Sequence, residues 1–394
     1  MTLDRSPIGH TAVPPWRDVR VLRIVAQVVV VVLVALVVAF LLRNLVTAMG
    51  QRGLGFGFGF LDTTAGFEIA ETPIPYTATD SYGQAFVVGL LNTLFVSLTG
   101  IVLATVLGLV VGVARLSSNL LVNRITAGYV EIIRNTPLLV QLFFLYAVLL
   151  QLPSVANTIA LPGSIFLNQR GLFVPAPEFT PSFDRWIVFV VAGIVVAIVA
   201  RVIAARREAA GLLIGGLGRL ALVALIALPV IGWLTAFQSP VRLEAPVQER
   251  FNFVGGLALS PEFTALLAGL VLYTAAFIGE VVRGGIQAVQ RGQLEAAHAL
   301  GLSEMQTLRM VVFPQALRVI IPPLTSQYLN LAKNSSLAIA IGYPDLFNVS
   351  RTMANQTGQP ISVIVLVMAT YLAISLATSL LMNLYNRRVQ VVER

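Results

Sequence analysis

The sequence predicts an all-α fold, a polytopic membrane bundle of about eight transmembrane helices. Hydrophobic residues make up 57% of the 394 residues and charged residues only 11%, whereas a soluble domain carries about 25% charged residues. The apolar residues form runs long enough to cross roughly 30 Å of hydrocarbon. The net charge of +8 is spread as single and paired basic residues between these runs, as in membrane proteins. This spacing argues against a surface that binds nucleic acid.

The first apolar run, 21–42, is longer than the roughly 7–15 apolar residues of a signal peptide. No small-x-small cleavage site follows it closely, so we expect a retained membrane helix. Seven further runs have the length of a span, and polar residues interrupt two of them, 129–150 and 317–341. The remaining five lie near 86–114, 186–204, 217–237, 263–289 and 361–385.

The orientation follows from the arginines. With both termini in the cytoplasm, the inner segments contain more than twice as many arginines as the outer ones, which is the expected bias. The outer segments 43–85, 151–185 and 238–262 are rich in Pro, Gly and aromatic residues, so we expect loops there. The Gly-Phe run at 55–60 has no preceding strand, as a phosphate loop would need. We expect its Phe side chains at the lipid headgroups.

The cytoplasmic loop between the sixth and seventh runs has its own structural pattern. The stretch 293–300 is rich in good helix formers. Gly301 suits the left-handed residue that ends a helix, and Ser303 and Gln306 have the spacing of a capping box. We therefore expect a short helix, a Gly turn and a second helix. The loop is short, flanked by spans and not especially basic, which argues against a DNA-binding helix-turn-helix. A plain structural loop is the other alternative.

This loop resembles the EAA loop of ABC importer permeases, and the matching residues are Glu295, Ala296, Ala297, Gly301 and Pro314. The resemblance implies that the loop couples the permease to a separate ABC ATPase subunit dimer. The chain has no G-x-x-x-x-G-K-S/T motif, so we expect no enzyme, no catalytic residue and no cofactor. The absence of cysteine excludes disulfides and metal–thiolate sites, and we expect no metal.

Three further segments, 131–141, 280–286 and 333–337, are similar to polar amino acid permeases of the histidine/glutamine/arginine/opine type. The outer segments 57–62 and 168–175 look like the larger permease subunit of general L-amino acid systems. The resemblance implies an importer of amino acids in the bacterial inner membrane. It also implies a second permease subunit, with a heterodimer favoured, and a periplasmic amino-acid-binding protein.

The resemblance further implies a type I ABC permease domain over 86–385, with a five-helix core that omits the first, fourth and fifth runs. A helical hairpin at about 186–237 would be an insertion in this core. An N-terminal helix with a periplasmic loop (1–85) would precede the domain, and a cytoplasmic tail (386–394) would follow it.

Ionisable residues inside spans are costly, and they mark pathways or buried pairs. Glu131 with Arg134, and Glu280 with Arg283, have the i,i+3 spacing that places both members on one helical face. We expect a substrate pathway formed by Glu131, Arg134, Asn135, Gln141, Glu280, Arg283, Lys333, Asn334, Ser335 and Ser336. In the alternatives, each pair neutralises itself, the arginines reach the headgroups, or Glu280 pairs with Lys333 to brace the bundle.

Prolines are expected to loosen two spans, at Pro137 and at Pro322 with Pro323. Broken helices can present backbone groups to a ligand, although proline is also tolerated in spans for packing alone. His298, beside the coupling motif, is expected to be a solvated or interface side chain.

The sequence therefore predicts a permease subunit of an ATP-driven amino-acid importer. An ion-gradient-driven secondary transporter would transport without ATP. A non-transporting membrane scaffold would not stimulate ATP hydrolysis in any partner.

Overall fold

The computed structural model describes residues 19–51, 56–210, 216–250 and 252–389. Among them, six helices are long and apolar enough to cross a membrane alone, and α3 with α4, bent by 109° at a short break, makes up to seven if the pair counts as one span. Helix α10 is less apolar and covers most of the predicted run 317–341. The six single spans are α1 (Val19–Gln51), α2 (Tyr82–Ala114), α5 (Phe183–Ala209), α6 (Leu217–Leu234), α7 (Pro261–Gln287) and α12 (Pro360–Val389). The bent pair is α3 (Leu120–Asn135) with α4 (Leu138–Leu150), and α10 is Phe313–Asn334. The predicted helical membrane bundle is confirmed.

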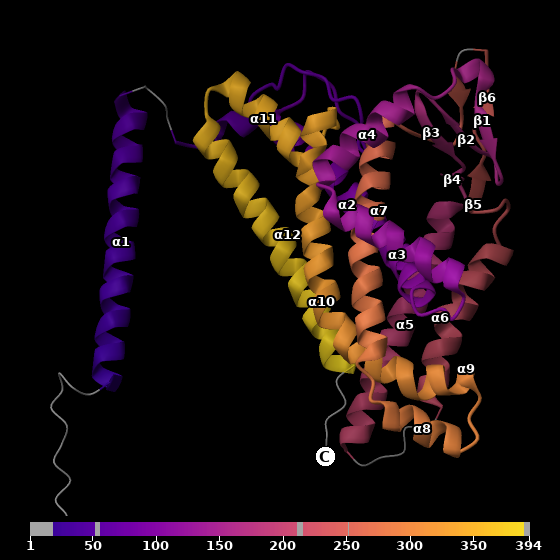
Figure 1. The fold of residues 1–394 in the computed structure, drawn as a ribbon. Coiled ribbons are helices and arrows are strands. Elements are labelled where there is room, and N and C mark those ends of the chain that lie inside the picture. Colours follow the sequence, from indigo (N-terminus) through magenta and orange to yellow (C-terminus); the bar gives the residue numbers. More distant parts are fainter. Residues whose placement is uncertain (1–18, 52–55, 211–215, 251, 390–394) are drawn as a thin grey trace, which may run out of the picture.

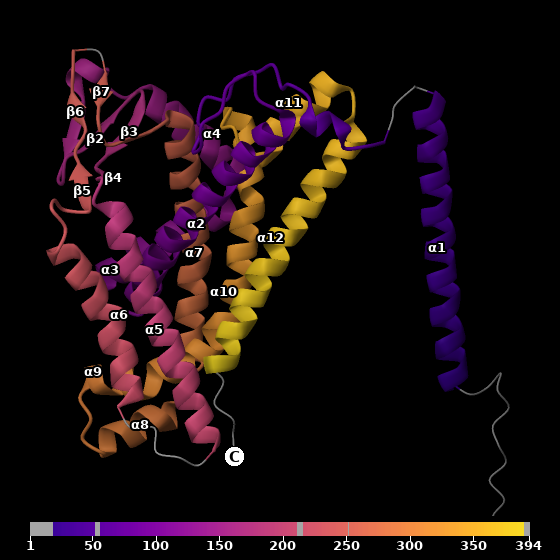
Figure 2. The ribbon, with the colours of Figure 1, turned by 180° about the vertical axis from the view of Figure 1, so that it is seen from behind.

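Helices α2 and α7 cross at the centre of the bundle, with α3, α4 and α10 packed around α7 and α12 packed on α10 (Figures 1 and 2). Small residues allow the central crossing: a Cβ atom at Gly112 would lie 2.7 Å from the carbonyl oxygen of Gly279. Close backbone approach through small residues is a common way for helices to associate in membranes. The buried side chains of Leu266, Leu270 and Leu331 belong to the core around this crossing.

The break between α3 and α4 falls at Pro137, as expected from the sequence. Gln141 stabilises it, because its Nε2 donates to the carbonyl oxygens of Ile133 at 2.8 Å and Thr136 at 2.9 Å. These carbonyls lie at the end of α3, where intrahelical partners run out. Gln141 is buried, and both of these hydrogen bonds are made at the break.

Helix α10 continues through Pro322 and Pro323, so no break occurs at this second proline position. Both prolines lie on an exposed side of α10. The irregularity comes earlier, as a π-helical turn over Leu308–Val312. After α10 the chain tightens into a 3-10 turn, Ser335–Ile341, and then forms α11 (Leu346–Thr357).

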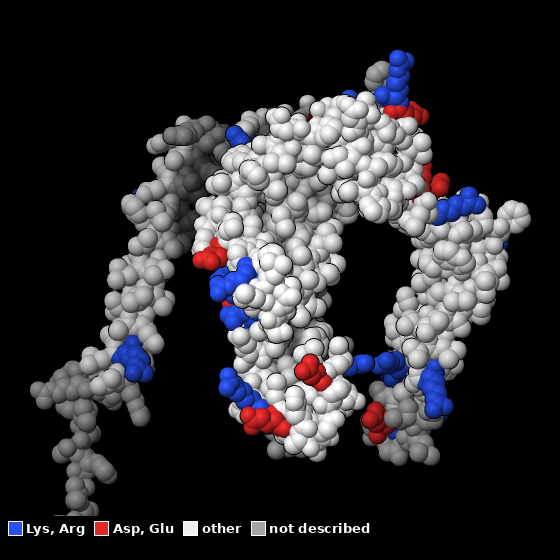
Figure 3. Space-filling view, turned by 45° about the vertical axis from the view of Figure 1, so that its right-hand side comes forward, with Lys and Arg blue, Asp and Glu red and all other residues white. Residues whose placement is uncertain are grey.

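Helices α5 and α6 form a hairpin that packs mainly on itself. The contact uses small buried residues, among them Gly193, Ala200, Ala221 and Ala224, and Trp186 Nε1 donates to the carbonyl oxygen of Pro229 at 3.0 Å. Figure 3 shows an open window between this hairpin and the rest of the bundle. The hairpin is therefore an attachment beside the bundle.

The segments expected as outer loops contain short strands that the sequence did not reveal. They are β1 (Ile159–Leu161), β2 (Ile165–Asn168), β3 (Gly171–Val174), β4 (Ala176–Phe179), β5 (Val241–Glu244), β6 (Val247–Gln248), β7 (Phe253–Val254) and β8 (Leu257–Leu259). They pair antiparallel in the orders β1-β2-β3-β8, β4-β5 and β6-β7. Strands from before and after the hairpin thus join each other and lead into α7 (Figure 2). We call this the strand end of the bundle, and the opposite end the α8 end.

The segment 56–81 packs over the start of α2 and over α11 at the strand end. Its short 3-10 turn, Gly59–Asp62, buries Phe60, whereas Phe56 and Phe58 are exposed. A second 3-10 turn, Val155–Asn157, precedes β1.

Candidate functional site

A polar cavity of about 410 Å³ lies between α2, α3 and α7, lined by Arg115, Glu131, Arg134, Asn135 and Glu280 with three less polar neighbours. Glu280 accepts from two arginines at once. Its Oε2 accepts from Arg115 Nη1 at 3.0 Å, and its Oε1 accepts from Arg283 Nε at 2.9 Å. Figure 3 shows basic and acidic side chains side by side at mid-height on one flank of the bundle. We call this cavity the charged pocket.

Arg134 and Glu131 do not pair as their spacing suggested. The Arg134 guanidinium lies 5.0 Å from the ring centroid of Phe277, a cation–π contact. Glu131 forms no ion pair among the residues that the structure describes. The charged pocket therefore presents one arginine and one carboxylate that salt bridges do not occupy.

The ten predicted pathway residues fall into three places. Four of them line the charged pocket, Arg283 reaches it through Glu280, and Gln141 serves the α3–α4 break. Arg115 was missed as a site residue because it stands directly after α2, where the sequence indicates a headgroup arginine. Its partner Glu280 lies 165 positions away, beyond any local pattern.

The remaining four, Lys333 to Ser336, lie where α10 ends, towards the strand end (Figure 1). The suggested pair of Glu280 with Lys333 is wrong, because the ion pairs of Glu280 among the described residues are with Arg115 and Arg283. Ser335 is buried and its hydroxyl donates to the carbonyl oxygen of Ala332, while Ser336 donates to that of Lys333, both at 2.8 Å. The two hydroxyls thus close the end of the helix.

Helix α10 carries an exposed row of residues at helical spacing: Pro322, Pro323, Ser326, Asn330 and Lys333. We call this row the polar face of α10. Polar groups in a bilayer are found against protein or water, seldom against lipid. The row also explains why α10 is less apolar than its neighbours.

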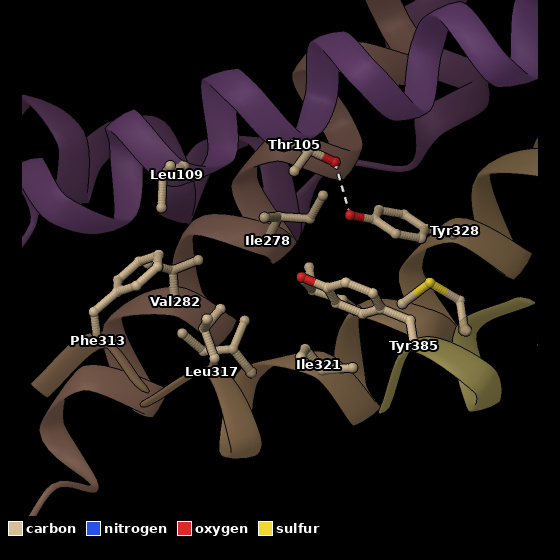
Figure 4. A pocket seen from close by; sticks show the side chains of 12 residues that line it. Thr105, Leu109, Ile278, Val282, Phe313, Leu317, Ile321, Tyr328 and Tyr385 are labelled. Carbon is tan, nitrogen blue, oxygen red and sulfur yellow. Dashed lines mark hydrogen bonds between the residues drawn. The ribbon is translucent and has the colours of Figure 1, made fainter. Parts of the chain in front are cut away.

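A second cavity, of about 440 Å³, is apolar and lies between α2, α7, α10 and α12 (Figure 4). Thr105 Oγ1 and the Tyr328 hydroxyl lie 2.9 Å apart at one edge. Thr105 Oγ1 already donates to the carbonyl oxygen of Ile101, so Tyr328 is the donor. The walls carry no charged side chain, which suits an apolar occupant and not a zwitterion.

The expected turn at the α8 end is confirmed. Helix α8 (Arg291–Ala299) ends before Gly301, whose φ is +74°, and α9 (Glu304–Thr307) begins with the Ser303/Gln306 capping box. Of the matching motif, Glu295 and Ala296 are exposed, Ala297 is buried, and Pro314 lies in the first turn of α10. His298 is exposed.

Large apolar side chains near this turn are exposed. Leu300, Met305 and Met310 are 82%, 71% and 64% exposed. Apolar side chains exposed together outside the membrane mark a surface for a protein partner.

Comparison with known proteins decides the family. Residues 217–391 match the family described as "Binding-protein-dependent transport system inner membrane component". The putative amino-acid ABC transporter permease protein YhdX of Escherichia coli is 49% identical over 93% of this chain and 94% of its own length. The chain belongs to the amino-acid ABC transporter permeases. It is a multi-pass inner-membrane permease subunit without an ATPase site, and its family implies a separate ATPase and a binding protein.

Two further relatives match along nearly the whole chain. The general L-amino acid transport system permease protein AapQ of Rhizobium johnstonii is 43% identical over 93% of this chain and 92% of its own. The glutamate/glutamine/aspartate/asparagine transport system permease protein BztB of Rhodobacter capsulatus is 40% identical over 96% of both. The matches with these permeases extend along nearly the whole chain, including the region of α5 and α6.

Proposed function

We propose that this permease forms, with a second permease subunit, the path along which amino acids enter the cytoplasm. The observation that carries the proposal is the polar face of α10. A face with Ser326, Asn330 and Lys333 is costly against lipid, so it turns towards the other subunit and a water-filled path. The relatives' names supply the substrate class, since all three are amino-acid permeases.

The charged pocket has the groups that a zwitterion needs. Arg134 and Asn135 face the α-carboxylate, because a charge-assisted hydrogen bond replaces the water that the carboxylate loses. Glu131 faces the α-ammonium group. Glu280 holds Arg115 and Arg283 in place through its ion pairs with both.

The remaining expectations belong to the same proposal. Both termini lie in the cytoplasm, so that the α8 end meets the ATPase dimer and the strand end meets the periplasmic binding protein. The partner permease is a different, shorter subunit, which makes a heterodimer. The permease domain covers 86–385, with the hairpin as an insertion between the N-terminal part, 1–85, and the tail, 386–394.

Cysteine labelling tests the polar face. The chain contains no cysteine, so Asn330→Cys creates a single thiol on that face. A water-soluble maleimide should label it in the assembled transporter, and ATP binding by the partner should change the rate. Leu376→Cys is the matched control, since Leu376 on α12 is 62% exposed on an apolar helix. Equal labelling of the two thiols would contradict a water-filled path at α10.

Transport itself is tested in proteoliposomes that contain the permeases, the ATPase and the binding protein. Radiolabelled glutamine, glutamate, aspartate and asparagine form the panel. Uptake of at least one of them should require internal ATP and should fail with an ion gradient alone. Uptake driven by the gradient without ATP would favour a secondary transporter, and no uptake together with no ATPase stimulation would favour a scaffold.

A further inference from the structure

A third cavity, with a polar lining, lies at the α8 end, between the residues directly after α7, the start of α8 and the first turns of α10. Its volume is about 370 Å³, enough for an amino acid, and its polar lining is Gln290, Gln293, Gln315 and Arg318. None of its lining residues carries a carboxylate. We call it the Arg318 pocket.

Arg318 is the unusual member of this lining. Its Nε is buried and has no hydrogen-bond partner among the described residues, and Arg318 forms no ion pair there. A guanidinium keeps its charge and has five N–H donors but no acceptor. A buried donor without a partner is costly, so the geometry favours an anionic group that arrives from outside the chain.

The end of α7 adjoins the same pocket. Helix α7 ends at Gln287, and Ala288, Val289 and Gln290 follow it along the pocket. The last carbonyls of a helix carry the negative end of its dipole and attract cations. The pocket thus combines a guanidinium on α10 with the residues that follow the C-terminus of α7, and the two suit the carboxylate and the ammonium of one amino acid.

The position of the pocket connects it to the path. Arg318 precedes Pro322 by one helical turn, so it lies at the α8 end of the polar face of α10. The only direct side-chain link described between α8 and α10 is a long one, 3.5 Å from Gln315 Nε2 to Gln293 Oε1. An amino acid in the pocket would therefore bridge the coupling helix and α10.

We infer that the Arg318 pocket binds the α-carboxylate of an amino acid on the cytoplasmic side of the path. This inference rests on the proposed transport function. It predicts that an amino acid accumulated inside occupies the pocket and slows further import.

The experiment uses the complete transporter in proteoliposomes that hold ATP and increasing internal L-glutamine, with uptake of external radiolabelled L-glutamine as the readout. Internal L-glutamine should lower the initial rate, while L-glutaminol, which lacks the carboxylate, should not. Arg318→Gln should raise the half-inhibitory internal concentration at least about tenfold, which corresponds to about 1.4 kcal/mol. Arg219→Gln, at an exposed arginine on α6, is the matched control and should inhibit like the unmodified chain.

Several results would overturn the inference. One is that Arg318→Gln and the unmodified transporter have the same half-inhibitory internal concentration of L-glutamine. Another is that L-glutaminol inhibits as strongly as L-glutamine. A third result has two parts: internal L-glutamine does not slow uptake by the unmodified transporter, and the Arg318→Gln permease no longer binds the ATPase. That result would assign Arg318 to an acidic side chain of the ATPase. Absence of uptake of all four amino acids of the panel without any internal load would instead contradict the proposed function, and the inference with it.

Discussion

Glu71 lies where the segment 56–81 meets the beginning of α7. Its carboxylate accepts a hydrogen bond from the Ser260 hydroxyl, and that hydroxyl caps α7 by accepting from the Phe263 amide at 3.0 Å. The Glu71 carbonyl oxygen accepts from Asn92 Nδ2 on α2 at 2.9 Å. Burial raises the pKa of Glu71 to about 7, and the negative charge of Glu262 raises it further, against the Ser260 hydrogen bond that lowers it.

This carboxyl predicts a pH dependence of stability. Its ordinary pKa is 4.5, so the folded chain binds more protons than the unfolded chain between that value and about pH 7. The contribution of Glu71 is therefore fully present below its unfolded pKa and is lost as the pH rises through about 7. Glu71→Gln cannot ionise and should unfold like the unmodified chain near pH 4.5. Near pH 8 its midpoint should lie about 2–4 °C higher, the effect of ~1 kcal/mol in a domain of intermediate size.

The measurement is thermal unfolding of the purified protein in detergent across this pH range. Glu68→Gln, at an exposed carboxylate three positions earlier, should leave the profile unchanged. Parallel profiles for Glu71→Gln and the unmodified chain would show that Glu71 ionisation does not affect stability.

At the scale of the element, local patterns predicted the helices and failed for the strands. The capping box and the Gly turn at Gly301 need only neighbours a few residues away, so the sequence was sufficient for them. Strands of two to four residues show too little alternation to detect, and β3 pairs with β8 across the whole α5–α6 hairpin. The Arg115–Glu280 ion pair was not predicted either, because its two residues are also far apart in the sequence.

The turn at Gly301 predicts a specific effect on coupling. A Cβ atom added there meets nothing within 4 Å, so the whole cost of a substitution comes from the positive φ, about 1–2 kcal/mol. Gly301→Ala should insert normally but lower ATP-driven uptake several-fold. Gly301→Asn should retain more uptake, because asparagine tolerates this conformation better.

Gly292→Ala is the matched control, since Gly292 lies on α8 with equally open space and no positive φ. It should keep normal uptake. If Gly301→Ala transported as well as Gly292→Ala, the left-handed turn would have no part in coupling.

At the scale of the whole molecule, the bundle carries two attachments. Helix α1 stands apart with none of its most apolar stretch buried (Figure 1), and the α5–α6 hairpin stands across the window of Figure 3. The apolar runs predicted both as spans. The resemblance to a five-helix core implies that the runs of α1, α5 and α6 lie outside the core. Periodicity alone does not predict their positions in space.

The hairpin predicts the last test. Its two ends meet at the strand end, where β4 pairs with β5 and the Thr180 amide donates to the Pro240 carbonyl oxygen at 3.1 Å. Residues 181–239 can therefore be replaced by a two-residue Asn-Gly turn, which suits antiparallel strands. Two spans are removed together, so the remaining spans keep their orientation. Because α5 and α6 pack mainly on each other, we expect the shortened chain to insert, assemble and retain part of its ATP-driven uptake.

Removing 181–215 alone deletes one span and should abolish correct insertion, as reporter fusions at the C-terminus would detect. Complete loss of uptake in a shortened chain that still inserts and binds its ATPase would place the hairpin on the transport path.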